Sequence, residues 1–277
     1  MITNQSRGGE TSNAAGWLRT DTSIRKRSLV YGVLVLACLV FFVVGLSPEF
    51  GFCSGVLFML MLAGLYFGFA EVFLLGLTFG LMLVFRRIDL LSRFWPLPTV
   101  LALAVLLAIG KLAPFAKGAF GWLRMGKWGR QQLLIISAVA AVSGVSLLSW
   151  YTIVKPDISD IVGRIAHVHP VALVSIGLLF SLSNAICEEF VWRGMIFDAL
   201  GKVFSSITAV VAVQALSFGM AHLNGFPRGA SGIVLASIYG CMMGCVRQNA
   251  NGLLAPIAAH AFADAVIYSI LVSAALA

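Results

Sequence analysis

The sequence predicts an all-α polytopic membrane protein with about eight transmembrane helices, within a range of roughly seven to nine. Two observations predict this class. Apolar residues make up 60% of the 277 residues and charged residues only 11%, and the mean hydropathy is +0.98. A soluble domain needs more charged surface than this. Apolar runs long enough to cross the hydrocarbon core, roughly 20 residues in a helix, also recur along the chain. We therefore expect lipid to surround most of the protein.

The candidate spans follow one another with only short polar segments between them. They cover residues 29–46, 52–85, 98–115, 131–154, 170–200, 204–223, 229–246 and 253–277. The second span is too long for one untilted helix and contains Glu71, so it is either one long tilted helix or two short ones. Glycines four apart, such as Gly240 and Gly244, place small residues on one helix face and predict close helix packing.

Two features leave the arrangement between residues 52 and 130 open. Basic residues flank the span at 98–115 on both sides, so both flanks would belong to the positive side, and we expect one boundary there to shift. Glu71 and Lys111 are charged residues at membrane depth in this region. Each is expected either to line a cavity or to extend its side chain to the membrane surface.

Residues 1–28 are polar, and we expect them to form a disordered basic tail before a single transmembrane domain at residues 29–277. Arg25, Lys26 and Arg27 directly precede the first apolar run, and no small-residue cleavage site follows it. The run is therefore predicted to be an uncleaved anchor. The basic tail favours a cytoplasmic amino end, and we expect a bacterial-type plasma membrane.

The net charge of +8 could suggest nucleic-acid binding. The Lys and Arg residues lie mostly in short segments that flank apolar runs, where they meet anionic headgroups and set orientation. We therefore predict the lipid bilayer and no nucleic acid as a partner. The five cysteines lie within or beside apolar segments and give little information on the redox compartment.

Ionisable residues at membrane depth concentrate in the last third of the chain, and each is by default a candidate site because burial in lipid is costly. Glu188, Glu189 and Arg193 lie in an otherwise apolar helix. Glu189 and Arg193 are four residues apart and are predicted to pair, whereas Glu188 points about 100° away and stays free. A free carboxylate suits a general base that activates water. The alternative is one buried ion network that only fixes helix packing.

Two histidines lie in later spans. His222 follows Phe218 by one helical turn, and His260 precedes Asp264 by one turn, so each pair shares a helix face. A single membrane histidine often only satisfies hydrogen bonds, but two histidines and an acidic cluster on three helices favour a functional site. Asn184 lies one turn before Glu188 and is placed to hydrogen-bond towards it.

These residues resemble the three motifs of the CPBP family of intramembrane proteases, also called the Abi or CAAX-protease (Rce1-like) family. The resemblance covers roughly residues 170–275 and is specific in combination, although each motif alone is weak. The motifs are Glu188-Glu189-x-x-x-Arg193, Phe218-x-x-x-His222 and His260-x-x-x-Asp264, in this order on successive helices.

The resemblance implies an eight-helix fold with a water-accessible cavity and an endopeptidase that acts on a membrane-associated or lipidated protein or peptide. It implies that Glu188 and His222 activate the attacking water, while His260 and the residue at 264 bind the oxyanion. Glu189, Arg193, Phe218 and Asn184 would support these residues. Prenylated tails, sorting-signal tails and bacteriocin or pheromone precursors are all compatible substrates.

The sequence departs from the family at one position, since many members carry Asn where this chain has Asp264. An amide donates to an oxyanion, whereas an ionised carboxylate repels it. Asp264 must then be protonated, orient His260, or ligate a divalent metal such as zinc together with Glu188, His222 and His260. We expect it to orient His260. The family was first described as metalloproteases and is now often viewed as metal-free glutamate proteases. The zinc motif with two histidines flanking Glu is absent, so no metal or cofactor is favoured.

Two other function classes are open from the residues alone. The same carboxylates and histidines could relay protons or ions in a small transporter, although no two related halves are evident. The chain could also be a catalytically silent immunity or scaffold protein, against which the intact motif set argues. Proteoliposome flux without proteolysis would favour the transporter.

Overall fold

The computed structural model describes residues 10–165 and 168–276, and over these residues it contains helices and no strand. By length and composition, six of the described helices can cross a membrane, or up to seven if one bent pair counts as a single span. The all-α class and the multi-pass membrane protein are thus confirmed. The expected number of about eight transmembrane helices agrees only approximately with these six or seven candidate spans.

The first group of helices runs up to residue 120, and its apolar core continues into later segments of the chain, which contribute Trp192, Leu200 and Phe218. Its core includes Phe42 and Phe79, whose rings stack with centroids 4.1 Å apart. The group consists of α1 (Glu10–Gly45), η1 (Pro48–Phe50), α2 (Cys53–Phe67), α3 (Ala70–Arg86), α4 (Asp89–Ser92), α5 (Leu97–Leu112) and η2 (Pro114–Phe120).

The long apolar stretch at 52–85 forms two helices, the second of the two expected alternatives. Gly68 ends α2 in the left-handed conformation, with φ 69°, which glycine adopts at little cost. The chain then reverses, and α2 and α3 approach so closely that a Cβ on Gly64 would lie 2.5 Å from the backbone nitrogen of Phe73.

The chain bends by 118° between α5 and η2. Ala113 is extended before Pro114, because a residue before proline avoids the helical conformation and proline has no N–H to continue the helix. The expected span at 98–115 therefore ends at Leu112. Of the basic residues that follow it, Lys117 lies in η2, Arg124 and Lys127 lie in the irregular segment after η2, and Arg130 begins the next long helix.

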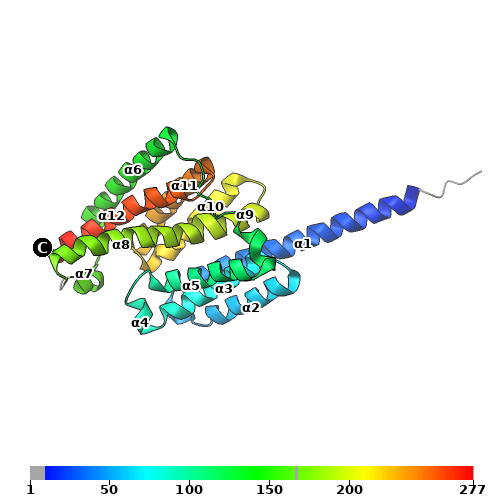
Figure 1. Ribbon diagram of the computed structural model, residues 1–277, viewed down its shortest axis with the longest axis horizontal. Coiled ribbons are helices and arrows are strands. Elements are labelled where there is room, and N and C mark those ends of the chain that lie inside the picture. Colours follow the sequence, from blue (N-terminus) through cyan, green and yellow to red (C-terminus); the bar gives the residue numbers. More distant parts are fainter. Residues whose placement is uncertain (1–9, 166–167, 277) are drawn as a thin grey trace, which may run out of the picture.

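The helix α1 begins before the expected boundary at residue 29. It includes residues 10–28, part of the expected disordered tail, and residues 1–9 lie outside the described residues. Adding a residue to an existing helix costs little, and this segment contains no proline. The early part of α1 extends beyond the other helices (Figure 1).

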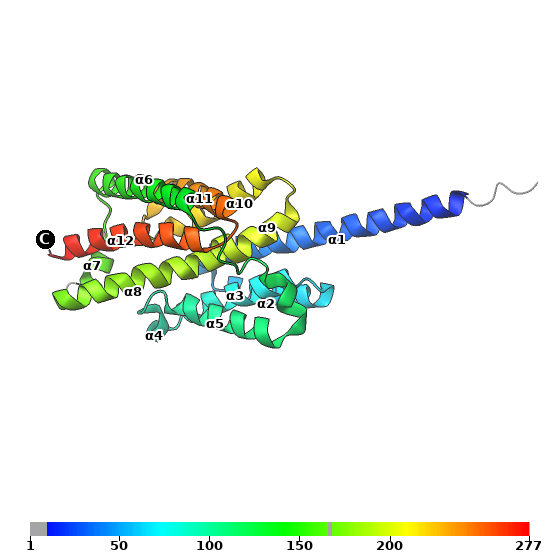
Figure 2. The same cartoon turned by 45° about the horizontal axis from the view of Figure 1, so that its top comes forward.

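The second group of helices contains all the motif residues. Within it, α12 packs against α8 and α6, and α10 packs against α11. In both views α8 lies between α2, α3 and α5 on one side and α6 and α11 on the other (Figures 1 and 2). The group consists of α6 (Arg130–Val154), α7 (Ser159–Ile165), α8 (Pro170–Glu189), η3 (Phe190–Ile196), α9 (Phe197–Val203), α10 (Ile207–Ala221), η4 (His222–Asn224), α11 (Gly229–Ala250) and α12 (Leu254–Leu276).

A π-helical turn, η3, joins α8 to α9 within one continuous apolar helix, Val171–Val203. The turn follows directly after Glu188 and Glu189 and contains Arg193. Single π-helical turns inside α-helices are frequent at functional sites, because they widen the helix and shift the side chains that follow. The motif carboxylates therefore lie where the central helix α8 changes its winding.

Candidate active site

Glu189 and Arg193 form the predicted ion pair. The Arg193 guanidinium donates from Nη1 to Glu189 Oε1 over 2.9 Å, and both side chains are 0% exposed. The guanidinium carbon also lies 4.5 Å from the ring centroid of Phe218 on α10. A buried charge needs a partner and further polar or aromatic contacts. This pair therefore links α8, η3 and α10.

His260 on α12 is oriented by Glu189. Its Nδ1 lies 2.6 Å from Glu189 Oε1, and because an ionised carboxylate only accepts hydrogen bonds, Nδ1 is the donor. The orienting hydrogen bond that we expected from Asp264 thus comes from Glu189. Asp264 Oδ1 lies 3.8 Å from the other ring nitrogen, Nε2, which is too long for a direct hydrogen bond.

Glu188 faces the same Nε2 of His260. Its Oε2 lies 3.7 Å from this nitrogen, and its side chain is 20% exposed, whereas that of Glu189 is fully buried. The two adjacent carboxylates thus differ as helix geometry predicts, one paired with Arg193 and one turned away from it. Of the two carboxylates, Glu188 is therefore the one with exposed surface.

Asn184 joins the carboxylates of two helices. Its Nδ2 donates to Glu188 Oε1 over 3.2 Å, as expected from their spacing. The same Nδ2 donates to Oδ2 of the buried Asp264 over 3.1 Å. An amide nitrogen carries two hydrogens, so one side chain can satisfy both bonds. Glu188 on α8 and Asp264 on α12 are thereby held at the same amide.

His222 is the first residue of η4, directly after α10. Its Nδ1 lies 2.9 Å from the Phe218 carbonyl oxygen, and since a carbonyl only accepts, Nδ1 carries the proton and Nε2 has the lone pair in the neutral ring. The Phe218 ring centroid lies 4.5 Å from that of His222 and 6.3 Å from that of His260. Phe218 therefore contacts both imidazoles.

The proposed metal ligands do not form a metal site in this arrangement. Among the described residues, no group of three or more His, Cys, Asp and Glu side chains is arranged to hold a metal ion. Nδ1 of His260 is bonded to Glu189, and Oδ2 of Asp264 is bonded to Asn184. Metal-binding side chains commonly make such hydrogen bonds through their other polar atom, so these two bonds do not decide for or against a metal.

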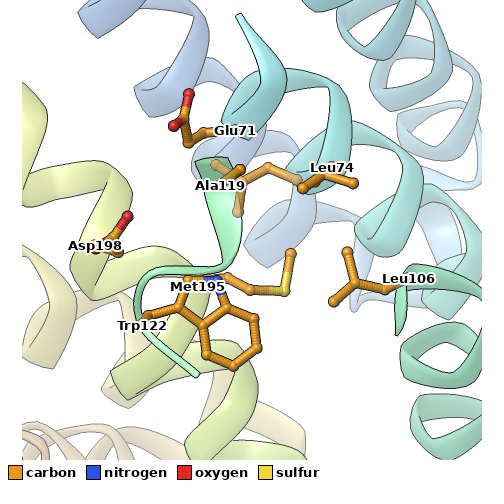
Figure 3. A pocket seen from close by; sticks show the side chains of 8 residues that line it. Glu71, Leu74, Leu106, Ala119, Trp122, Met195 and Asp198 are labelled. Carbon is orange, nitrogen blue, oxygen red and sulfur yellow. The ribbon is translucent and has the colours of Figure 1, made fainter. Parts of the chain in front are cut away.

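A small cavity lies elsewhere, between the first helix group and α9 (Figure 3). Glu71 lines it and pairs with Lys202, which also lies 3.5 Å from Asp198. The cavity that Glu71 lines is thus separate from the motif residues, while Lys111 is exposed in the last turn of α5. No predicted site residue lines this cavity, whose walls are formed by Glu71, Leu74, Leu75, Leu106, Ala119, Trp122, Met195 and Asp198.

Sequence reasoning missed two residues that contact the site. Trp95, in the loop after α4, donates from Nε1 to Asn184 Oδ1 over 2.8 Å. Tyr239 on α11 packs edge-on against the His260 ring at 5.5 Å. Neither residue belongs to a motif, and neither shares a helix with a motif residue, so no spacing signal could have identified them.

Comparison with known proteins supports the motif assignment. A sequence model of the family described as type II CAAX prenyl endopeptidase Rce1-like matches residues 170–266, the segment that carries all three motifs. Searches of curated proteins and of solved structures gave no match. The family match confirms the resemblance and indicates protease activity of the CAAX type in general, with a protein substrate in a membrane setting.

Proposed function

We propose that this chain is an intramembrane endopeptidase that hydrolyses a peptide bond in a membrane-associated or lipidated protein or peptide. Glu188 and His222 activate the water, His260 binds the oxyanion, and no step passes through a metal. The bilayer is the environment of the reaction, and the substrate is a protein or peptide segment that reaches the site from it.

One observation carries the proposal. The partly accessible carboxylate of Glu188 lies 3.7 Å from Nε2 of His260, a nitrogen whose ring is fixed from the other side by the buried Glu189. A contact of this length leaves room for a bridging water or a substrate oxygen bonded to both groups. A base and an electrophilic group facing one small volume is the arrangement that acyl-transfer chemistry requires.

The reaction begins at Glu188. A water molecule gives one proton to the Glu188 carboxylate while its oxygen forms a bond to the carbonyl carbon of the scissile peptide. The lone pair on Nε2 of His222 accepts a hydrogen bond from this water and orients it. The carbonyl π electrons move to oxygen, which produces the tetrahedral oxyanion.

The oxyanion is stabilised by His260. In this role both ring nitrogens carry a proton, and Nδ1 donates to Glu189 while Nε2 donates to the oxyanion. The proton held by Glu188 then passes to the peptide nitrogen as the C–N bond breaks. The products are a carboxylic acid and an amine, and one water molecule is consumed.

The test compares the wild-type protein with Glu188→Gln and His222→Ala. We expect each variant to lower kcat by roughly 100-fold or more, the effect of losing a general acid–base group. Comparing membrane peptides from cells that express wild-type protein or Glu188→Gln identifies the substrate, and the purified protein in detergent gives kcat on that substrate.

The matched control is Glu49→Gln, the same chemical change at an exposed residue of η1, and it should cleave like the wild type. All variants must unfold at a temperature close to that of the wild type. Full activity of Glu188→Gln would contradict the proposed function, because the variant lacks the carboxylate that accepts the proton from water.

A further inference from the structure

We infer that Trp95 is a positioning residue for this site, an inference that rests on the proposed function. Its indole N–H donates to Asn184 Oδ1, and Asn184 Nδ2 donates to both Glu188 and Asp264. Trp95 thus acts on the carboxylates through one intervening amide.

The indole decides which way the Asn184 amide faces. Indole Nε1–H is a donor and has no acceptor capacity, so the amide atom next to it must be the oxygen. The NH₂ group is then necessarily the end that faces the carboxylates. The identity of the two amide atoms, which geometry alone does not distinguish, is fixed here by the chemistry of Trp95.

The orientation of the amide determines whether the carboxylates are attracted or repelled. With NH₂ towards them, one hydrogen reaches Glu188 and the other reaches Asp264. With the amide reversed, its oxygen would face two carboxyl oxygens, none of which can donate when ionised. Glu188 would then lose the contact that fixes its position relative to His260, and a small displacement of a catalytic group lowers the rate.

Trp95 comes from the helix group that carries none of the motifs. It lies between α4 and α5, and its ring is contacted from α3 by the Arg86 guanidinium, 5.8 Å from the ring centroid. The N-terminal half of the chain therefore supplies a polar contact to the site on α8. Trp95 itself lies outside the segment matched by the family, residues 170–266, whereas Asn184 lies inside it.

Trp95→Phe tests the inference because it keeps an aromatic ring and removes the N–H. We expect kcat to fall roughly fivefold, the net effect of one hydrogen bond, with KM unchanged because Trp95 does not touch the substrate. The matched control is Trp128→Phe at an exposed tryptophan, which should leave both constants unchanged. An unchanged kcat in Trp95→Phe, with Glu188→Gln inactive, would overturn the inference and leave the proposed function intact.

A double-mutant cycle separates positioning from general packing. In the Asn184→Ala background, Trp95→Phe should change kcat by less than about twofold, because residues that act through one contact are not additive. Additive effects on kcat would mean that Trp95 acts through packing and would overturn the inference.

The unfolding midpoints of the same four proteins in detergent provide a readout without substrate. We expect the midpoint shifts to be non-additive as well, which supports the Trp95–Asn184 link even if the wild type cleaves nothing and the proposed function fails. Additive shifts of the unfolding midpoint would show that Trp95 and Asn184 are not energetically coupled, and would overturn the inference.

Discussion

Two adjacent carboxylates in this protein occupy different environments, and this difference supports the separate roles proposed for them. Glu189 is fully buried, bonded to Arg193 and to His260, whereas the Glu188 side chain is 20% exposed and faces Nε2 of His260. A buried carboxylate with two donors is held in place and unsuited to exchange protons with water. This difference supports the proposed roles, in which Glu189 orients His260 and Glu188 reacts.

Asp264→Asn tests whether a negative charge is needed beside His260. The Asn oxygen can accept the hydrogen bond from Asn184, and its NH₂ group then faces the oxyanion position and adds a donor. We expect kcat to stay within roughly threefold of the wild type or to rise, since the hydrogen bond is kept. The measurement is kcat on the identified substrate.

Asp264→Leu serves as the comparison, because it removes both the charge and the hydrogen bond from Asn184. We expect a larger loss of kcat than in Asp264→Asn. Should Asp264→Asn lose as much activity as Glu188→Gln, the carboxylate itself would be essential and Asp264 would belong with the catalytic groups.

The helices that carry the motifs are joined by polar contacts as well as by packing. Glu189 links α8 to α12 through His260, and Arg193 links η3 to α10 through the Phe218 ring. These contacts join three helices at the site, so the ion pair contributes to the architecture.

Glu189→Gln should destabilise the protein strongly. The change leaves the Arg193 guanidinium buried without its counter-charge, and breaking a buried pair in this way costs about 3–5 kcal/mol. Thermal unfolding in detergent should show a large drop in the midpoint. Glu188→Gln, at the partly exposed carboxylate, should unfold close to the wild type, and equal destabilisation by both variants would contradict the distinction between the two residues.

Close packing of α10 and α11 predicts a second effect at the level of helices. A Cβ on Gly240 would lie 2.9 Å from Cα of Ala215, in agreement with the packing expected from Gly240 and Gly244. Gly240→Ala should therefore separate the helices and lower stability by about 1–3 kcal/mol. It should also lower kcat, because α10 carries Phe218 and leads into His222.

Gly201→Ala is the matched control, since a Cβ there meets nothing within 4 Å. It should leave kcat unchanged and should not lower the unfolding midpoint. If Gly240→Ala behaves like Gly201→Ala, the helices are less tightly packed than the structure indicates.

In the whole molecule, the site lies along the central helix α8, which runs between the two helix groups (Figures 1 and 2). The C-terminal group supplies all the motif residues, and the N-terminal group supplies Trp95. We therefore expect the proposed activity to depend on contacts between the two groups.

Metal removal tests the proposed chemistry on the intact protein. Because no proposed step passes through a metal, cleavage after treatment with EDTA and 1,10-phenanthroline should proceed at the untreated rate. Elemental analysis of the treated protein must show that divalent ions are gone. Loss of cleavage that zinc restores would favour the metal-dependent alternative.

Helix geometry explains which parts of the site were predictable. The Glu189–Arg193 pair and the Asn184–Glu188 hydrogen bond both join residues four apart, and such neighbours share a helix face whatever the rest of the fold does. The all-α membrane class was equally predictable, because composition and the length of the apolar runs determine it.

The other contacts of the site depend on packing between segments that are distant in the sequence. The Glu189–His260 bond joins residues 71 positions apart, and the Trp95–Asn184 bond joins residues 89 positions apart. Such contacts depend on how whole helices are oriented against one another, and the 118° bend after α5 is part of that arrangement. The sequence by itself determined the helices and the pairs within them. Only the tertiary structure decided which carboxylate holds His260, because that depends on where α12 packs against α8.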